Sequence, residues 1–193
     1  MTQALTIVMM RHGKPLLDLE AGDGVRMTAA QVGQVVSEYE KTELDALSVP
    51  PKASMDAANG CSWSICSDLP RAVSSIEALG LRNISTIDPL YRESAMPFIK
   101  SRFPRMTFFS WAVLFRIAWL VGFSRHGESI REAKIRAKRA ADKLESLSEA
   151  HGSVLNLGHG IMNRLIIKEL KLRGWQVRVR TGEKYWSYTV LEN

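Results

Sequence analysis

The tripeptide Arg11-His12-Gly13 combines three residue types that suit chemistry on a phosphate group. The planar guanidinium of an arginine offers paired donors to phosphate oxygens, and a neutral imidazole offers a lone pair that can attack phosphorus. A glycine beside them lets the backbone approach a ligand closely. These residue types therefore suit an anionic ligand, but the tripeptide alone is weak evidence for such a site.

The apolar run before this tripeptide predicts a buried strand. Residues 5–10 contain one polar side chain, Thr6, and no helical stripe of apolar residues, which is typical of a strand covered on both faces in a parallel sheet. Ligands of such sheets bind beyond the carboxyl ends of the strands, which is where Arg11 and His12 would lie. Arg125-His126-Gly127 repeats the letters without a strand before it, so we expect it to lie outside the site.

A second predicted strand leads to another arginine. Residues 62–66 alternate polar and apolar side chains, and a helix is predicted over residues 73–79, closed by Gly80. Because proline fits only the first turn of a helix, Pro70 places Arg71 at the helix N-terminus. Free amides and the helix dipole favour an anion there.

Glu93 and His159 also follow predicted strands. Residues 83–87 read as a short strand, and Glu93 comes soon after it, where a catalytic carboxylate fits. Residues 154–157 read as a buried strand that ends in Gly158-His159-Gly160, before a helix over residues 161–172. This repeats the arrangement around His12, so His159 would face the same edge of the sheet.

The remaining elements follow from caps and breakers. Capping boxes at Thr28 and Ser129 predict helices over about 29–41 and about 130–149. The alternation over residues 185–191 predicts a last strand. His151 has no motif around it and is expected to be exposed. The prolines and glycines of two further segments predict loops, over residues 14–26 and 47–60.

Residues 107–121 are almost wholly apolar, and Arg116 is their one charged residue. They are fewer than the roughly 20 residues that a membrane-spanning helix needs, and a central arginine is costly in a bilayer. We therefore predict a helix, closed by Gly122, that packs over the domain. Its functional role would be that of a lid giving the active site an apolar wall.

The composition is that of a globular protein. With 193 residues, 46% of them hydrophobic and 24% charged, one domain over residues 1–193 is expected. The net charge of +6 favours anionic partners. Residues 131–143 carry six basic and two acidic side chains without interleaved aromatic residues, so a solvated helix face is expected and nucleic acid is not an expected partner.

The two cysteines, Cys61 and Cys66, lie on either side of a predicted strand and are expected to be free thiols, as in a reducing compartment. The N-terminus shows no basic segment followed by a long apolar one, so we expect a cytoplasmic protein that is not exported.

Five motifs, taken in order, resemble the histidine phosphatase superfamily, which has the phosphoglycerate mutase-like fold. They are Arg11-His12-Gly13, Ser67-x-x-x-Arg71-Ala72, Glu93 in Leu-Tyr-Arg-Glu, Gly127-Glu128-Ser129, and Gly158-His159-Gly160. The resemblance spans almost the whole chain. It implies a three-layer α/β fold, with a mostly parallel central sheet, helices on both faces, and residues 95–128 as a helical lid insertion.

The resemblance also implies a role for each residue. His12 is the nucleophile that forms a phosphohistidine, while Arg11, Arg71 and His159 hold the phosphoryl oxygens, His159 being also a catalytic residue. Glu93 protonates the leaving alkoxide and later activates water. Two guanidiniums and a histidine can neutralise the transferring group without a metal, so neither metal nor cofactor is expected. The implied enzyme is a metal-independent phosphomonoesterase of the histidine acid phosphatase type, acting on a small phosphorylated substrate.

Two departures from the common pattern concern substrate choice. Many relatives have Ser or Thr where this chain has Pro15, which removes a hydroxyl and a backbone donor from the pocket rim. Many have Ser or Pro where this chain has Asp68, whose charge would oppose a phosphate unless the side chain turns away.

Other activities stay open at this point. A mutase would need to retain a bisphosphate intermediate, for which the lid is short. Protein phosphohistidine phosphatases lack both a lid and the Glu93 motif. A non-catalytic phosphate-binding protein, attached to a partner or a membrane through the Trp111 and Trp119 helix, is the third alternative. Membrane contact is not the expected role, and a homodimer is compatible with the sequence.

Overall fold

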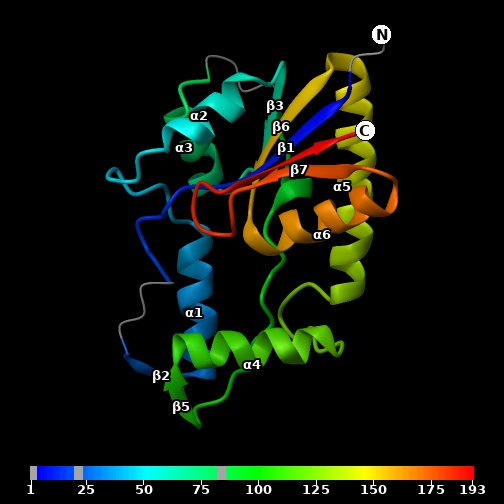
Figure 1. Cartoon of the computed structure of the whole chain (residues 1–193). Coiled ribbons are helices and arrows are strands. Elements are labelled where there is room, and N and C mark those ends of the chain that lie inside the picture. Colours follow the sequence, from blue (N-terminus) through cyan, green and yellow to red (C-terminus); the bar gives the residue numbers. More distant parts are fainter. Residues whose placement is uncertain (1–3, 20–23, 82–85) are drawn as a thin grey trace.

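The apolar run before Arg11 forms β1, the strand around which a six-stranded sheet is built (Figure 1). The computed structural model describes residues 4–19, 24–81 and 86–193. The sheet order is β4-β3-β6-β1-β8-β7. Its strands are β1 Thr6–Arg11, β3 Trp63–Cys66, β4 Thr86–Ile87, β6 Ser153–Gly158, β7 Gln176–Arg180 and β8 Tyr188–Glu192. Neighbours from β4 to β1 are parallel, whereas β8 is antiparallel to both β1 and β7.

Both faces of β1 are buried, as its continuous apolar sequence predicts. Ile7 and Met9 belong to a core shared with α5 (Ile130–His151) and α6 (Gly160–Leu172). Val8 and Met10 belong to a second core, shared with α2 (Lys52–Asn59) and α3 (Pro70–Ala78). The predicted fold class, a mostly parallel sheet with helices on both faces, is therefore confirmed.

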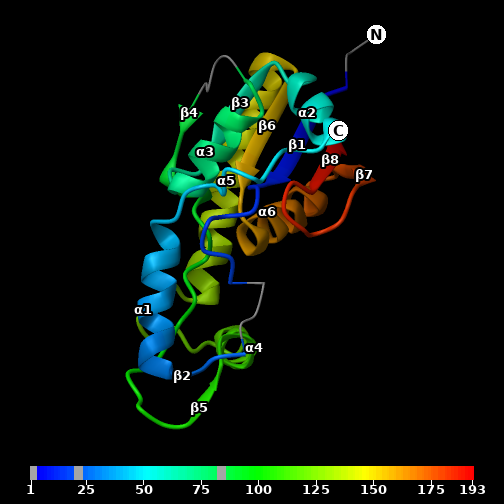
Figure 2. The ribbon, with the colours of Figure 1, turned by 90° about the vertical axis from the view of Figure 1, so that its left-hand side faces the viewer.

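A third apolar cluster lies away from the sheet. Ala29 and Val32 of α1 (Ala29–Glu40) pack with Trp111 and Phe115 of α4 (Phe108–Leu120), and Met96 completes the cluster. A two-stranded sheet adjoins it, made of β2 (Arg26–Thr28) and β5 (Arg105–Thr107). Figures 1 and 2 both show α4, β2 and β5 at the end of the molecule opposite the chain termini.

The predicted helix signals hold. Thr28 and Ser129 form complete capping boxes at the starts of α1 and α5. Pro70 opens α3, and Gly80 follows that helix with a φ of +70°. Thr107 caps α4, which is followed by Gly122 with a φ of +100°.

The loop predicted over residues 47–60 is wrong, because α2 occupies Lys52–Asn59. Pro51 is the N-cap of this helix rather than a breaker, and a Lys52–Asp56 ion pair one turn apart supports it. Ser54 and Ala58 form its buried side. Two prolines before the helix and Asn59-Gly60 at its end were therefore boundaries rather than evidence of a loop.

Other differences are smaller. The last strand begins at Tyr188 rather than at residue 185, because Trp186 adopts a turn conformation with a φ of +63°. The sequence did not predict β2, β5, β7 or the 3-10 helix at Pro89–Tyr91. His151 is not exposed as expected but half-buried, stacked on Trp63 with ring centroids 4.0 Å apart. Of the strand predicted over residues 83–87, only Thr86–Ile87 lies within the described residues, and residues 20–23 of the first predicted loop also lie outside them.

Candidate active site

His12 and His159 lie next to each other at the carboxyl ends of two neighbouring strands. In the parallel pairing of β1 with β6, Arg11 stands opposite Gly158, and the His12 N–H donates to the Gly158 carbonyl at 3.0 Å. This register brings the two imidazole rings to a centroid separation of 5.0 Å. The sequence prediction that both histidines face one edge is thus confirmed by their positions.

The hydrogen bond of the His12 ring leaves one nitrogen available for attack. Nδ1 lies 2.7 Å from the Gly13 carbonyl oxygen, and because a carbonyl can only accept, Nδ1 carries the proton. The lone pair of the neutral ring is then on Nε2. Burial is the main cause that holds the pKa of His12 well below its usual value, and the charges of Arg71 and Arg11 act in the same direction. His12 is therefore a buried, neutral base.

His159 is fully buried, and neither ring nitrogen has a hydrogen-bond partner among the described residues. Burial lowers the pKa of His159 well below its usual value, and the neighbouring His12, Arg71 and Arg11 lower it further. A buried polar ring without a partner is costly unless a ligand satisfies it. This ring is suited to hold an oxygen of a bound anion.

Arg71 enters the site from the first turn of α3. Its side chain is buried, donates to the Tyr39 carbonyl at 2.9 Å and lies 4.3 Å over the Tyr39 ring. Its buried Nε has no partner within the described part of the chain. Burial lowers the pKa of Arg71, against the charges of Tyr39 and Glu93, but a guanidinium stays protonated at neutral pH. Arg71 therefore brings a largely desolvated positive charge to the site.

Arg11 comes from the end of β1 and is fixed by the segment before β8. It donates to the Glu183 carbonyl at 2.8 Å and lies 4.5 Å over the Tyr185 ring. Tyr185 also approaches His12, at a centroid distance of 5.7 Å. The two arginines thus flank the histidine pair from different elements.

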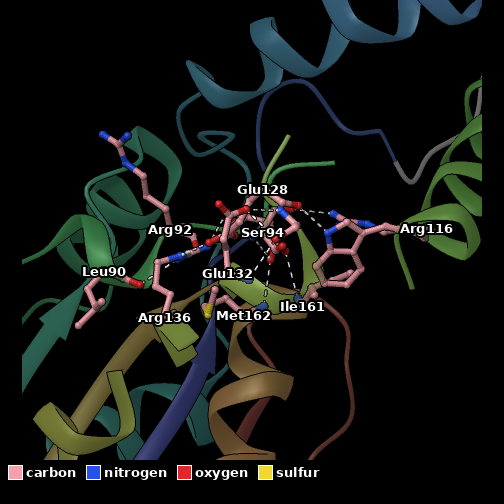
Figure 3. A network of polar contacts seen from close by, with 12 residues as sticks. Leu90, Arg92, Ser94, Arg116, Glu128, Glu132, Arg136, Ile161 and Met162 are labelled. Carbon is pink, nitrogen blue, oxygen red and sulfur yellow. Dashed lines mark hydrogen bonds and ion pairs between the residues drawn. The ribbon is translucent and has the colours of Figure 1, made fainter. Parts of the chain in front are cut away.

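The Glu93 side chain lies at the N-terminus of α6, the helix that begins at Gly160, directly after His159. Its carboxylate accepts the N–H groups of Ile161 at 3.1 Å, Met162 at 3.0 Å and Ser94 at 2.9 Å (Figure 3). A Cβ atom placed on Gly160 would lie 3.8 Å from both Glu93 Oε2 and Arg11 Nε. The structure therefore brings Glu93 beside Arg11 and His159, and it also uses the carboxylate to cap the helix.

A half-buried arginine fixes the segment that carries Glu93. Arg136 of α5 pairs with Glu128 through two hydrogen bonds, of 2.8 and 2.6 Å, and donates to the carbonyls of Leu90 and Arg92 (Figure 3). Glu128, the acidic residue of the fourth sequence motif, therefore positions Glu93 indirectly. It reaches the site through Arg136 rather than by its own contact.

The Asp68 side chain is paired with an arginine. Its carboxylate forms a two-pronged pair with Arg92, at 2.6 and 2.5 Å, so its charge is compensated. Pro15 forms an isolated antiparallel β-bridge with Leu44, and as a proline it offers no backbone N–H donor. His126, from the repeated tripeptide, stacks on Phe98 at 5.0 Å and takes a φ of +61°, which is a packing role.

A cavity of about 490 Å³ opens beside Arg71 and Glu93. Ser94 and Arg116 also line this cavity. The Ser94 Oγ and the Arg116 Nη1 are buried and have no hydrogen-bond partner among the described residues. Its walls come from α1, α4 and the segment after Glu93, and most of them are apolar. These wall residues include Val36, Met96, Phe108, Phe109 and Ala112.

Sequence reasoning missed several residues that shape this site. Arg71 lies over the Tyr39 ring, and Arg11 lies over the Tyr185 ring. Trp186 packs so closely on Gly13 that a Cβ atom on Gly13 would lie 2.3 Å from the indole. Ser94 and Arg116 line the cavity. Tyr39, Tyr185 and Trp186 stand in no motif, and only the fold brings them to the histidines.

Across residues 4–19, 24–81 and 86–193, no group of three or more His, Cys, Asp or Glu side chains gathers as a metal site would require. Over the same residues, no helix has both the length and the apolar character needed to cross a bilayer. Cys61 and Cys66 are free thiols, as predicted, and burial raises the pKa of each to about 12.

No protein-family model matches this chain, and no curated protein matches it by sequence. Solved structures do match it. A mycobacterial glucosyl-3-phosphoglycerate phosphatase superposes with a TM-score of 0.62 at 20% identity, covering 98% of this chain and 90% of its own. The ecdysone phosphate phosphatase of Bombix mori, solved with tungstate, gives 0.57 at 16% identity over 96% and 88%. A candidate alpha-ribazole-5'-phosphate phosphatase from Escherichia coli gives 0.58 at 17% identity over 86% and 79%.

These structural neighbours are histidine phosphatase superfamily members, so the resemblance seen in the sequence is confirmed at the level of the fold. The chain has the phosphoglycerate mutase-like fold of that superfamily.

Proposed function

We propose that this protein is a metal-independent phosphomonoesterase that works through a phosphohistidine at His12. One observation carries the proposal: a buried neutral imidazole has its Nδ1 proton fixed on the Gly13 carbonyl and lies among two guanidiniums and a second histidine. That arrangement suits in-line attack on a phosphate dianion. The phosphatase names of the structural neighbours support the same reaction class.

In the first half-reaction, the Nε2 lone pair of His12 attacks phosphorus, and the bond from phosphorus to the ester oxygen breaks. Arg11, Arg71 and His159 hold the other three oxygens while charge shifts between them. The leaving alkoxide takes a proton from Glu93. In the second half-reaction, Glu93 removes a proton from water, the resulting hydroxide attacks phosphorus, and the bond to Nε2 breaks to release inorganic phosphate.

This cycle requires Glu93 to exchange protons while it is bound to the backbone. Its carboxylate accepts three backbone N–H groups, two at Oε1 and one at Oε2, which leaves an acceptor position on Oε2 for the proton that it carries and delivers. The clamp of Arg136 on the carbonyls of Leu90 and Arg92 keeps the rest of the segment in place during this exchange. Glu93 is therefore the proposed acid and base, and Arg136 is a positioning residue.

The cavity supports a small phosphomonoester with a partly apolar alcohol as the substrate. Arg71 and Glu93 line the cavity, and in this proposal the phosphate binds beside them, while Phe108, Met96 and Val36 contribute apolar wall. In this proposal residues 95–128 are the lid, since α4 supplies that wall. A reducing, cytoplasmic location is part of the proposal and is supported by the two free thiols.

A matched pair of histidine variants tests the proposal. His12→Asn removes the nucleophile, whereas His126→Asn changes the histidine of the repeated tripeptide, and asparagine tolerates its positive φ. We expect His12→Asn to lower kcat on p-nitrophenyl phosphate by about 10³-fold or more. His126→Asn should keep near wild-type activity, and a chelator should leave the wild-type rate unchanged.

The covalent step has its own readout. Brief reaction with labelled phosphate ester followed by quenching in base should retain label on wild-type protein and none on His12→Asn, since phosphohistidine is lost in acid. Equal rates for wild type and a folded His12→Asn would overturn the proposal. Label on any residue other than His12 would do so as well.

A further inference from the structure

The outer face of α4 is apolar although it is exposed. Trp111, Phe115 and Trp119 point inward and are only 2 to 3% exposed. On the other side, Leu114, Ile117 and Leu120 are 48, 57 and 64% exposed, with Phe109 and Val113 beside them. A helix on a protein surface normally turns polar residues outward, so an apolar outer face indicates contact with something else.

The chain around α4 carries charge of one sign. Residues 95–127 contain five basic residues and no acidic one. Lys100, Arg102, Arg105 and Arg125 are exposed, and Phe103, between two of these arginines, is 78% exposed. An apolar helix face combined with a loop of arginines around an exposed aromatic ring is the pattern of a segment that lies in a membrane interface.

A second copy of the chain is a poorer occupant for this face. In a symmetric dimer the same patch meets itself, which would bring the basic residues of both copies together without any acidic residue of residues 95–127 to pair with them. An anionic lipid surface complements both the charge and the apolar side chains. Since α4 has 13 residues, it would lie in the plane of the interface rather than cross it.

We propose that the outer face of α4 and the loop of residues 100–105 dock on an anionic membrane surface. Both lie at the end of the molecule away from the central sheet (Figure 2), so the sheet and its helices need not enter the lipid. The sequence-based expectation that this helix only packs over the domain is then true for its inner face alone.

The position of the cavity adds a consequence that rests on the proposed function. Phe109 lines the cavity and is also 74% exposed on the outer side of α4. One wall residue of the cavity therefore belongs to the proposed docking face. An enzyme docked in this way takes phosphomonoesters with an apolar alcohol from the lipid interface.

Vesicle flotation of the full chain tests the docking without using catalysis. We expect wild-type protein to float with vesicles in which about a third of the lipid is phosphatidylserine, and about tenfold less with phosphatidylcholine alone or at high salt. Ile117→Glu/Leu120→Glu should lose flotation by about tenfold or more. Lys100→Glu/Arg102→Glu should lose most of the preference for anionic lipid.

Matched controls separate these effects from general changes in surface. Leu172→Glu alters an equally exposed leucine on α6, and Lys168→Glu/Lys171→Glu makes the same charge change there; both should float like wild type. Every variant should hydrolyse soluble p-nitrophenyl phosphate at the wild-type rate, which shows that it is folded. If wild type is inactive yet floats, only the proposed function fails.

Three results would overturn the docking proposal. The first is wild-type protein that does not float with anionic vesicles, and the second is an Ile117→Glu/Leu120→Glu variant that floats like wild type. The third is a wild-type dimer in light scattering that this variant converts to a monomer, which would assign the face to contact between copies.

Discussion

At His12, burial and two neighbouring guanidiniums all disfavour the protonated ring. The same holds for His159, where burial acts first and the charges of His12 and the arginines add to it. A histidine in water is half-protonated near pH 6.5. Both rings therefore stay neutral in the folded protein at a pH where they would already carry protons in the unfolded chain.

This difference predicts how stability depends on pH. Below about pH 6.5 the unfolded chain binds protons at His12 and His159 and the folded chain does not, so each histidine removes stability as the pH falls, by at most about 1.4 kcal/mol per pH unit. Urea unfolding of wild type and of His12→Asn/His159→Asn between about pH 7 and 5, in a buffer without phosphate, measures it. The variant should lose stability less steeply, and parallel curves would contradict the prediction.

Sequence reasoning did best at this scale, because chemistry restricts the residue types. The five predicted positions meet: Arg11, His12, Arg71, Glu93 and His159. The additional binding of Glu93 to the N-terminus of α6 could not be predicted, since the two segments are 68 residues apart. The pairing of Asp68 with Arg92 could not be predicted either, because it depends on how the two loops fold over each other.

At the scale of elements, the turn after β1 depends on close packing. The Gly13 N–H donates to Ser75 Oγ at 2.9 Å, which in turn donates to the Arg71 carbonyl at 2.6 Å. A Cβ atom on Gly13 would lie 2.3 Å from the Trp186 ring and 2.6 Å from Leu44. The glycine therefore lets the C-terminal loop close over the strand that carries His12.

A pair of glycine substitutions tests this packing. Gly13→Ala should lower the free energy of unfolding by about 1–3 kcal/mol, because the indole must move to admit a methyl group. Gly60→Ala is the control, since Gly60 has a φ of −74° and a methyl group on it would lie 3.5 Å from the Asp56 carbonyl oxygen, an ordinary contact distance. That variant should be neutral or more stable by up to about 1 kcal/mol. Urea unfolding measures both, and equal losses would refute the packing argument.

Most elements with strong local signals were predicted from the sequence. Strand β1, both capping boxes and the α3 start at Pro70 follow from local chemistry. Strand β7 has five exposed residues and pairs with β8 at the edge of the sheet. Its sequence, Gln-Val-Arg-Val-Arg, alternates polar and apolar residues as a strand does, but the run is short and was missed.

At the scale of the whole molecule, the site lies where strand ends meet α3, α6 and the cavity beside α4. Positive charge from Arg11 and Arg71 gathers around two neutral histidines. An anion bound among these groups would stabilise the folded chain, because the unfolded chain has no such site.

Vanadate provides the test. At a concentration about 100 times its Kd, a site ligand adds about 2.7 kcal/mol, and a chain of this length gains roughly 2–4 °C in Tm per kcal/mol. We therefore expect a rise in Tm of about 5–10 °C by scanning calorimetry, and little or no rise for Arg71→Met. Lys168→Met, which removes an exposed charge on α6, should respond like wild type. If Arg71→Met shows the same rise in Tm as wild type, the anion binds elsewhere.

The packing of helix faces against one another was the feature that the sequence predicted least well. The apolar run of residues 107–121 predicted the helix, but it did not predict which side of the helix packs against the rest of the protein. The cavity depends equally on α1 and the segment after Glu93, whose relative position is set by packing between distant residues.

The order of strands in the sheet has a consequence for biosynthesis. Strand β1 leaves the ribosome first, but its two neighbours, β6 and β8, are made last. The nascent chain must therefore carry an unpaired apolar strand through most of translation, a condition that favours aggregation and chaperone binding. Since Trp186 and β8 complete the surroundings of His12, this site would form only after β8 has been synthesised.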